Sequence, residues 1–260
     1  MNNKMNSKPI IAAIIPARYA STRLPAKPLI DLCGKPMIQH VYERAKQASL
    51  VTNVLVATDH ENIAAAVHAF GGECAMTSPD IRSGSDRIAA AAKNLSGTDI
   101  IVNVQGDEPL IAPLMIDAAI QPMIDDASIQ VATLVKKIDS AAELTNPNIV
   151  KCVLDEAGYA IYFSRSPIPY LRDNVDIGTW HTRHTYFKHI GLYVYRKPFL
   201  LQFSSWKEST LERIEKLEQL RILEHGIRIK ATITEYDSIP IDTPEDAERV
   251  RAILQQSKAQ

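Results

Sequence analysis

The first half of the chain alternates short apolar runs with segments of helical periodicity. The run at residues 10–15 is apolar without a break, which is typical of a strand buried on both faces of a parallel sheet. Similar runs at residues 52–57 and 99–104 are separated by helical patterns, so we predict an α/β fold with a three-layer, Rossmann-like, mostly parallel sheet. The clearest helical pattern begins after Pro36, and its expected apolar face consists of Met37, Ile38, Val41, Tyr42 and Ala45.

The pattern changes near residue 125, where strand-like segments follow one another without long helices between them. Residues 155–159 read D-E-A-G-Y, which is typical of a hairpin turn. One amphipathic helix is expected over residues 211–226, with Ile214 near its apolar face. We therefore expect a smaller hairpin subdomain that is not a separable domain. Its expected strands cover residues 130–137, 150–154, 160–164, 187–195 and 229–234.

Composition narrows the class of protein. Of the 260 residues, 46% are hydrophobic and 23% are charged, as in ordinary globular proteins. The formal net charge of −1 argues against nucleic acid or an anionic membrane as a partner. Three cysteines without C-x-x-C spacing suit a reducing compartment, and the first apolar run is too short for a signal-peptide core or a membrane span. We predict a cytoplasmic protein.

The loop after the first predicted strand concentrates positive charge. Arg18, Arg23 and Lys27 lie close together in sequence, between prolines that stiffen the loop. Arginine offers phosphate oxygens a planar fork, and lysine offers a mobile point charge. Because ligands of open α/β sheets bind beyond the carboxyl ends of the strands, this loop predicts a phosphate site.

Two acidic positions are candidates for metal binding. Asp107 lies in a G-D-E-P turn directly after a buried strand, and Mg²⁺ takes one or two carboxylates together with phosphate oxygens. Asp242 precedes a helix that Thr243 is expected to cap, and the cap does not need this acid. A phosphate loop with two such acids is typical of nucleotidyl transfer.

Two further polar positions have different interpretations. Arg87 lies near the positive end of an expected helix, where cations are disfavoured, so we expect it to contact a ligand. Asp59 follows the second predicted strand, but the first loop lacks G-x-G-x-x-G. We therefore expect Asp59 to be a turn or helix-cap residue and not a ribose ligand.

The same residues resemble the bacterial CMP-Kdo synthetases, which are 3-deoxy-manno-octulosonate (Kdo) cytidylyltransferases of lipopolysaccharide synthesis. The resemblance runs from residue 10 to about residue 250 and implies a nucleotidyltransferase-type fold. It implies transfer of CMP from CTP to the anomeric hydroxyl of Kdo, with Mg²⁺ as cofactor, by a homodimer. The motifs are P-A-R-Y-A-S-T-R-L-P-x-K-P-L, A-T-D, S-G-S-D-R, V-N-V-Q-G-D-E-P, N-P-N-x-V-K, Y-F-S-R-x-x-I-P, K-H-I-G-L-Y, L-E-x-I-E-K-L-E-Q-L-R and D-T-P-E-D.

The resemblance also implies roles for individual residues. The residues implied in catalysis are Arg18, Lys27, Asp107 and Asp242, and the two acids bind Mg²⁺. The residues implied in nucleotide binding are Pro16, Ala17, Arg18, Arg23, Lys27, Ser83, Arg87 and Gln105. The residues implied in sugar-acid binding are Gln105, Arg165, His189, Glu218 and Gln219. One departure is Ala26, which stands where the family often has glycine and is expected to alter the backbone angles of the loop.

The resemblance suggests a layout and leaves two alternatives. The first alternative is the same reaction on 8-amino-Kdo, because no residue of the sequence distinguishes the two sugars. The other is a non-catalytic CTP-binding regulator, which the presence of Lys27, Asp107 and Asp242 argues against. The implied layout is a disordered extension at 1–9, one cytidylyltransferase domain at 10–250 and a helix end at 251–260. Within the domain, residues 10–125 form the nucleotide-binding half and residues 126–242 form the sugar-acid and dimerisation half.

Overall fold

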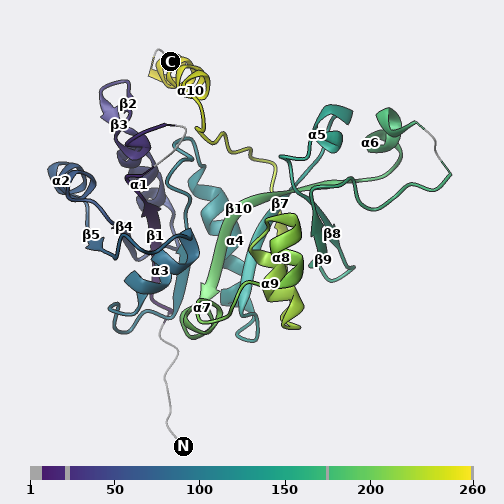
Figure 1. The fold of residues 1–260 in the computed structure, drawn as a ribbon, viewed down its shortest axis with the longest axis horizontal. Helices are drawn as coiled ribbons and strands as arrows, with labels where there is room; N and C mark the ends of the chain where they lie inside the picture. The colour runs from purple at the N-terminus through teal and green to yellow at the C-terminus, as the bar shows by residue number, and fades with distance from the viewer. Residues whose placement is uncertain (1–7, 21–23, 174–175, 259–260) are drawn as a thin grey trace, which may run out of the picture. The chain divides into compact units, whose positions relative to one another are not determined.

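The computed structural model of the protein describes residues 8–20, 24–173 and 176–258 (Figure 1). The expected N-terminal extension therefore lies outside the described residues except for residues 8 and 9, and Arg23 lies outside them too. Contacts divide the chain into two compact units. Unit 1 comprises Met1–Asp117, Tyr195–Ser204 and Ser238–Gln260, and unit 2 comprises Ala118–Val194 and Ser205–Asp237.

Unit 1 is built on four parallel strands in the order β5-β4-β1-β6. Every residue of β1 except Pro16 is buried, as expected for a strand covered on both faces. Its Ala12 is paired with Asn53 of β4, and its Ile11 with Ile100 of β6. The strands are β1 (Ile11–Ala17), β4 (Asn53–Thr58), β5 (Cys74–Met76) and β6 (Ile100–Asn103).

Helices follow these strands as the alternating pattern predicts. The buried residues of α1 are Met37, Ile38, Val41, Tyr42 and Ala45, which confirms the predicted apolar face. The helices of this unit are η1 (Lys27–Leu29), α1 (Met37–Gln47), α2 (Glu61–Ala69), α3 (Gly84–Ala92), α7 (Lys197–Phe203) and α10 (Pro244–Lys258), while α4 (Pro113–Asp125) begins in unit 1 and ends in unit 2.

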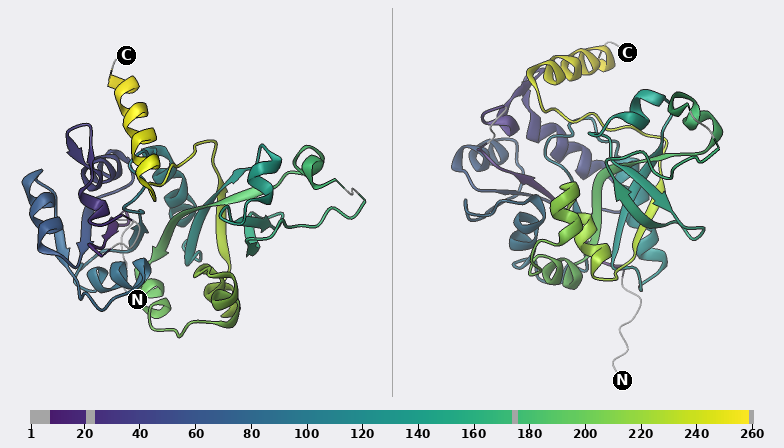
Figure 2. Two further views of the ribbon diagram at one scale, coloured as in Figure 1. Left: turned by 45° about the horizontal axis from the view of Figure 1, so that its top comes forward. Right: turned by 45° about the vertical axis from the view of Figure 1, so that its right-hand side comes forward.

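The C-terminal helix α10 returns to the beginning of the chain. It packs against the hairpin of β2 (Asp31–Leu32) and β3 (Lys35–Pro36), as the views of Figure 2 show. The buried cluster at this contact is Leu32, Met37, Ile241, Ala247, Val250 and Leu254. Burial of Ile241 in this cluster fixes the segment that contains Asp242.

Unit 2 contains mainly antiparallel strands in the order β10-β7-β11-β9-β8, and β8 also pairs with β10. The turn between β8 and β9 has the predicted hairpin form, with Gly158 at φ 73°. With parallel pairs in unit 1, this antiparallel pairing confirms an α/β fold with mixed strand directions. The strands are β7 (Val131–Lys137), β8 (Lys151–Leu154), β9 (Tyr159–Ser164), β10 (Phe187–Arg196) and β11 (Ile229–Ile233), and the helices other than the two described next are α5 (Ala141–Thr145), η2 (Ile177–Thr179) and α6 (Trp180–Arg183).

The expected single helix over residues 211–226 is wrong. Two short helices, α8 (Thr210–Glu215) and α9 (Gln219–Glu224), are separated at Lys216, whose φ of 54° ends the first. Ile214 is accordingly 71% exposed and does not belong to an apolar face. Among the described residues, no helix is long and apolar enough to cross a membrane.

Candidate active site

A pocket in unit 1 collects the cationic and acidic candidates beyond the ends of β1 and β6. Its cavity measures about 330 Å³, which is within the range of small-molecule sites. The candidates that line it are Pro16, Ala17, Arg18, Lys27, Ser83, Arg87, Gln105, Asp107 and Asp242. The structure therefore brings together every described residue predicted to hold nucleotide or metal.

Lys27 lies between the two candidate metal ligands. Its Nζ is 2.8 Å from Oδ2 of Asp107 and 2.9 Å from Oδ1 of Asp242. The lysine side chain is 13% exposed, whereas the two carboxylates are 35% and 41% exposed. One ammonium thus holds two half-exposed acids together, although they are 135 residues apart in sequence (242 − 107).

This pair of acids fits the ligand preferences of Mg²⁺. Mg²⁺ binds one or two carboxylates and fills its remaining positions with water and phosphate oxygens. In the described part of the chain, no group of three or more His, Cys, Asp or Glu side chains is arranged to hold a metal ion. Asp107 and Asp242 match the carboxylate part of the ligand set that Mg²⁺ prefers.

Backbone contacts fix the two acids. The amide of Ile241 donates to the carbonyl of Asp107 at 2.9 Å, which ties the turn after β6 to the segment before α10. The amides of Asp242 and Thr243 both donate to Oδ2 of Asp246, at 3.0 and 2.9 Å. Thr243 and Asp246 also bond through the threonine hydroxyl, so the predicted cap of this helix is confirmed.

Gly106 allows the turn after β6 to approach β1. A Cβ atom at this position would lie 2.6 Å from the carbonyl oxygen of Pro16, closer than side chains tolerate. Only glycine lets the two backbones meet this closely. The contact sets the position of Asp107 relative to the loop after β1.

Ala26 adopts the left-handed conformation that favours glycine. It precedes η1 with φ 52° and ψ 32°, so Lys27 follows a backbone position where a Cβ is unfavourable. A glycine, which has no Cβ, would adopt this conformation without that cost.

Arg87 borders the pocket, but its side chain is buried in contacts within the protein. It is 2% exposed, and its Nη2 lies 2.9 Å from Oδ2 of Asp59 and donates to the carbonyl of Ile81 at 3.0 Å. Asp59 is thus an ion-pair partner and not a helix cap. The N-cap of α2 is His60, whose Nδ1 accepts from the amide of Asn62.

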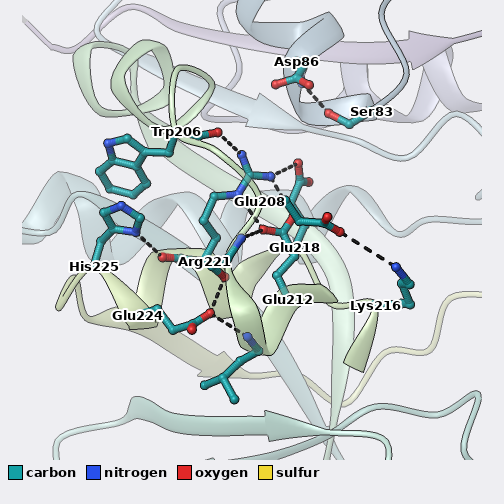
Figure 3. Close-up of polar contacts among 12 residues, drawn as sticks. Ser83, Asp86, Trp206, Glu208, Glu212, Lys216, Glu218, Arg221, Glu224 and His225 are labelled. Carbon is teal, nitrogen blue, oxygen red and sulfur yellow. Dashed lines mark hydrogen bonds and ion pairs between the residues drawn. The ribbon is translucent and has the colours of Figure 1, made fainter. Parts of the chain in front are cut away.

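Ser83 and Arg82 also line the pocket, and Glu108 follows Asp107 in the turn after β6. Ser83 caps α3, because its Oγ accepts from the amide of Asp86 at 2.9 Å (Figure 3). Arg82 is an additional cation in the lining that sequence reasoning missed, although it directly precedes the S-G-S-D-R motif. Burial, together with the neighbouring charge of Asp107, raises the pKa of Glu108 to about 7.

The sugar-acid candidates other than Gln105 lie in unit 2. Arg165 donates to three backbone carbonyls: Nε to Glu215 at 2.7 Å, Nη1 to Pro147 at 3.0 Å and Nη2 to Lys216 at 3.4 Å. The carboxylate of Glu215 accepts from the Arg165 amide and from the Ser164 hydroxyl. Arg165 therefore ties the N-P-N turn to the junction between α8 and α9.

His189 is a partly buried, neutral imidazole. The hydroxyl of Thr133 has one proton and lies 2.8 Å from the carbonyl of Leu192, so we assign it as donor there and as acceptor from Nε2–H of His189 at 3.1 Å. Phe163 and Tyr193 pack their rings beside the imidazole, at centroid distances of 5.1 and 5.2 Å. Desolvation lowers the pKa of His189 to about 3.

Acid is expected to destabilise the fold through His189. Between pH 6.5 and pH 3, His189 binds a proton in the unfolded chain but stays neutral in the folded protein. The free energy of unfolding therefore falls as the pH falls. From pH 7.5 to pH 5 this group should remove about 2 kcal/mol of unfolding free energy. Urea unfolding of the wild type and His189→Gln at both pH values checks this. The fall in unfolding free energy between the two pH values should be about 2 kcal/mol smaller in His189→Gln than in the wild type. An equal fall in both proteins would contradict the role of His189. His68→Gln, at an exposed histidine, serves as the matched control.

Glu218 and Gln219 lie at the junction of the two short helices, and the carboxylate of Glu218 contacts the buried guanidinium of Arg221 (Figure 3). Arg221 binds both carboxylate oxygens of Glu212, at 2.8 and 2.9 Å, and one oxygen of Glu218, at 3.1 Å. The Glu212 side chain is 10% exposed and that of Glu218 is 32% exposed. Both oxygens of Glu212 are thus buried in the ion pair with Arg221, whereas Glu218 is paired with Arg221 and remains accessible to solvent.

Comparison with known proteins places this chain in a family. A sequence model of the cytidylyltransferase family matches residues 12–229. The 3-deoxy-manno-octulosonate cytidylyltransferase of Geotalea uraniireducens is 56% identical over 244 residues, which cover 92% of this chain and 97% of that protein. The corresponding protein of Pelobacter propionicus is 53% identical over 251 residues, covering 94% and 98%.

A solved structure agrees with these relatives. The structure of a CMP:2-keto-3-deoxy-manno-octonic acid synthetase complexed with CTP superposes with a TM-score of 0.89 at 45% identity, covering 95% of this chain and 99% of that one. The fold is that of α/β enzymes of the cytidylyltransferase class. The chain belongs to the cytidylyltransferase family and, within it, to the 3-deoxy-manno-octulosonate cytidylyltransferases.

Proposed function

We propose that this protein transfers CMP from CTP to the anomeric hydroxyl of Kdo and releases pyrophosphate, as a step of lipopolysaccharide synthesis. The observation that supports the chemistry most directly is the position of Lys27 between Asp107 and Asp242 in a pocket lined by cationic side chains. The substrates are supported by the close relatives and by the related structure solved with CTP.

In this proposal the pocket of unit 1 binds CTP and Mg²⁺. Arg18 and Lys27 hold the phosphates, Asp107 and Asp242 hold the metal ion, and the start of α3 lies near cytidine. When bound, Mg²⁺ draws negative charge from the phosphate oxygens. The ammonium of Lys27 contacts both acids and offsets the repulsion between them.

The chemical step needs no protein nucleophile. The anomeric oxygen of Kdo forms a bond to the α-phosphorus, and the bond from that phosphorus to the oxygen of the leaving pyrophosphate breaks. The proton of the anomeric hydroxyl passes to solvent. The contribution of the protein is to position the reactants and to stabilise charge on the α-phosphate, a role that we propose for Lys27 of the pocket lining.

Residues of unit 2 are proposed to bind the sugar acid. Arg165 supplies positive charge, Glu218 and Gln219 supply groups for hydroxyls, and neutral His189 supplies a polar ring edge. The proposal further includes a cytoplasmic location, a homodimer, and a three-layer nucleotidyltransferase-type sheet with a smaller hairpin subdomain. It also includes the division of the domain into a nucleotide half and a sugar-acid half.

Arg165→Ala is expected to raise the KM for Kdo about tenfold or more and to leave the KM for CTP within about twofold. The guanidinium joins the N-P-N turn to the α8–α9 junction, so its loss removes charge and loosens the segment that precedes Glu218. Steady-state kinetics with each substrate varied in turn measure both constants. Arg172→Ala, at an exposed arginine of the same unit, should change neither. A larger change in the KM for CTP than in the KM for Kdo would indicate that Arg165 takes part in nucleotide binding.

The acceptor is tested by pyrophosphate release with CTP and Mg²⁺ in the presence of Kdo, 8-amino-Kdo or sialic acid. Release with Kdo at least as efficient as with the amino sugar supports the proposal. A clear preference for the amino sugar would keep the phosphate and metal assignments and replace the acceptor. Silence with all three acceptors, despite measurable CTP binding, would favour a non-catalytic CTP-binding protein.

A further inference from the structure

The loop after β1 is attached to the segment after β4 by two contacts of Tyr19. The amide of Tyr19 donates to Oδ1 of Asp59 at 3.0 Å. The ring of Tyr19 stacks on the imidazole of His60, with centroids 3.7 Å apart and planes inclined by 12°. Main chain and side chain of one residue therefore bind two consecutive residues of another loop.

Asp59 connects this attachment to the rest of the pocket wall. Its Oδ2 lies 2.9 Å from Nη2 of Arg87, and the two side chains are 11% and 3% exposed. Arg87 belongs to α3 and also donates to the hydroxyl of Thr77. One buried carboxylate thus joins the loop after β1 to the segments after β4 and β5.

The neighbour of Tyr19 is the exposed Arg18, which lines the pocket. A flexible loop must give up conformational freedom when it closes on a ligand, and each residue ordered in advance lowers that cost. The contacts of Tyr19 lie one residue beyond the cation, so they order the backbone that presents its guanidinium. They do not themselves reach the reacting groups.

We propose that Tyr19, His60 and Asp59 form a latch that positions Arg18 for the triphosphate. The proposal rests on the proposed function of the pocket in CTP binding. The three residues are positioning residues, and their effect is expected on the affinity for CTP and not on the chemical step. The ion pair of Asp59 with Arg87 holds the latch in register with α3.

A double-mutant cycle on the ring stack tests the latch. Tyr19→Ala removes one ring, and His60→Asn removes the other while retaining an oxygen that can cap α2. Each single variant should raise the KM for CTP about three- to tenfold, in line with the usual strength of an aromatic pair. The double variant should be no worse than the more affected single variant, because both changes break the same contact.

The controls separate positioning from general damage. The turnover number and the KM for Kdo should stay within about twofold of the wild type in all three variants, and Tyr19→Phe should retain the KM for CTP. An unchanged KM for CTP in both single variants, or effects that multiply in the double variant, would overturn the latch. If only one single variant folds, its ratio of KM for CTP to KM for Kdo still tests the latch. A ratio equal to that of the wild type would overturn it. A wild-type protein that transfers no CMP would instead overturn the proposed function.

Discussion

Asp107→Asn should lower turnover by about a thousandfold and leave the fold intact. The carboxylate lies at the surface of the pocket, where it accepts from Lys27 and is 35% exposed. An amide of the same shape keeps a hydrogen-bond acceptor but removes the charge that Mg²⁺ requires. Since metal and cations are proposed to stabilise the charge on the α-phosphate, the metal's part of that stabilisation should disappear.

The test compares Asp107→Asn with a matched acid away from the pocket. Asp125→Asn changes an exposed residue of α4 whose carboxylate accepts from Gln121, and it should retain full activity. Pyrophosphate release is measured over a range of Mg²⁺ concentrations, with circular dichroism as the check on folding. Near-normal turnover of Asp107→Asn at saturating Mg²⁺ would contradict its role as a metal ligand.

Arg221→Met should destabilise the protein by about 3–5 kcal/mol, the usual cost of leaving one partner of a buried ion pair without the other. The guanidinium binds Glu212 through two parallel hydrogen bonds, and both side chains are at most 10% exposed (Figure 3). Its Nη1 also donates to the carbonyl of Trp206 at 3.0 Å. Urea unfolding measures the loss.

Two comparisons make this prediction specific. Lys216→Met breaks an ion pair with Glu208 whose side chains are 71% and 52% exposed, so the midpoint of unfolding should barely move. Adding Glu212→Gln to Arg221→Met removes the unpaired charge and keeps an acceptor for the amide of Ser209, so it should restore much of the stability. A loss no larger in Arg221→Met than in Lys216→Met would show that the buried pair does not stabilise the fold.

Local patterns predicted the elements whose partners are also local. The apolar face of α1 could be predicted because five buried residues repeat at helical spacing, whatever packs on them. The cap before α10 could be predicted because Thr243, Pro244 and Asp246 are close in sequence. The meeting of Lys27 with Asp107 followed from a topological rule, since the carboxyl ends of parallel strands lie at one edge. The rule does not cover Asp242, which precedes α10 and does not follow a parallel strand.

Features that depend on distant partners could not be predicted. The break at Lys216 brings Glu212 and Arg221 together, yet on a straight helix residues nine apart lie about 13.5 Å apart along the axis. The apolar periodicity of residues 211–226 gives no sign of that bend. The helix α4 was also missed, because Pro122 in its interior weakens the helical pattern.

The misinterpretation of Asp59 has the same origin. An aspartate after a strand usually caps the next helix, and nothing nearby in sequence indicates that Arg87, 28 residues later, neutralises it. Arg87 was expected to face a ligand because a cation is unfavourable at the start of a helix. The structure supplies a different compensation, since the buried carboxylate of Asp59 offsets the cost.

The most direct test of the proposed function is ³¹P NMR of a reaction containing the protein, CTP, Mg²⁺ and Kdo. The proposal predicts that the three CTP signals decline while a phosphodiester signal and a pyrophosphate signal grow in equal amounts. No change should occur when Kdo is left out. Formation of free CMP with pyrophosphate, or of CDP with phosphate, would show hydrolysis in place of transfer and would contradict the proposal.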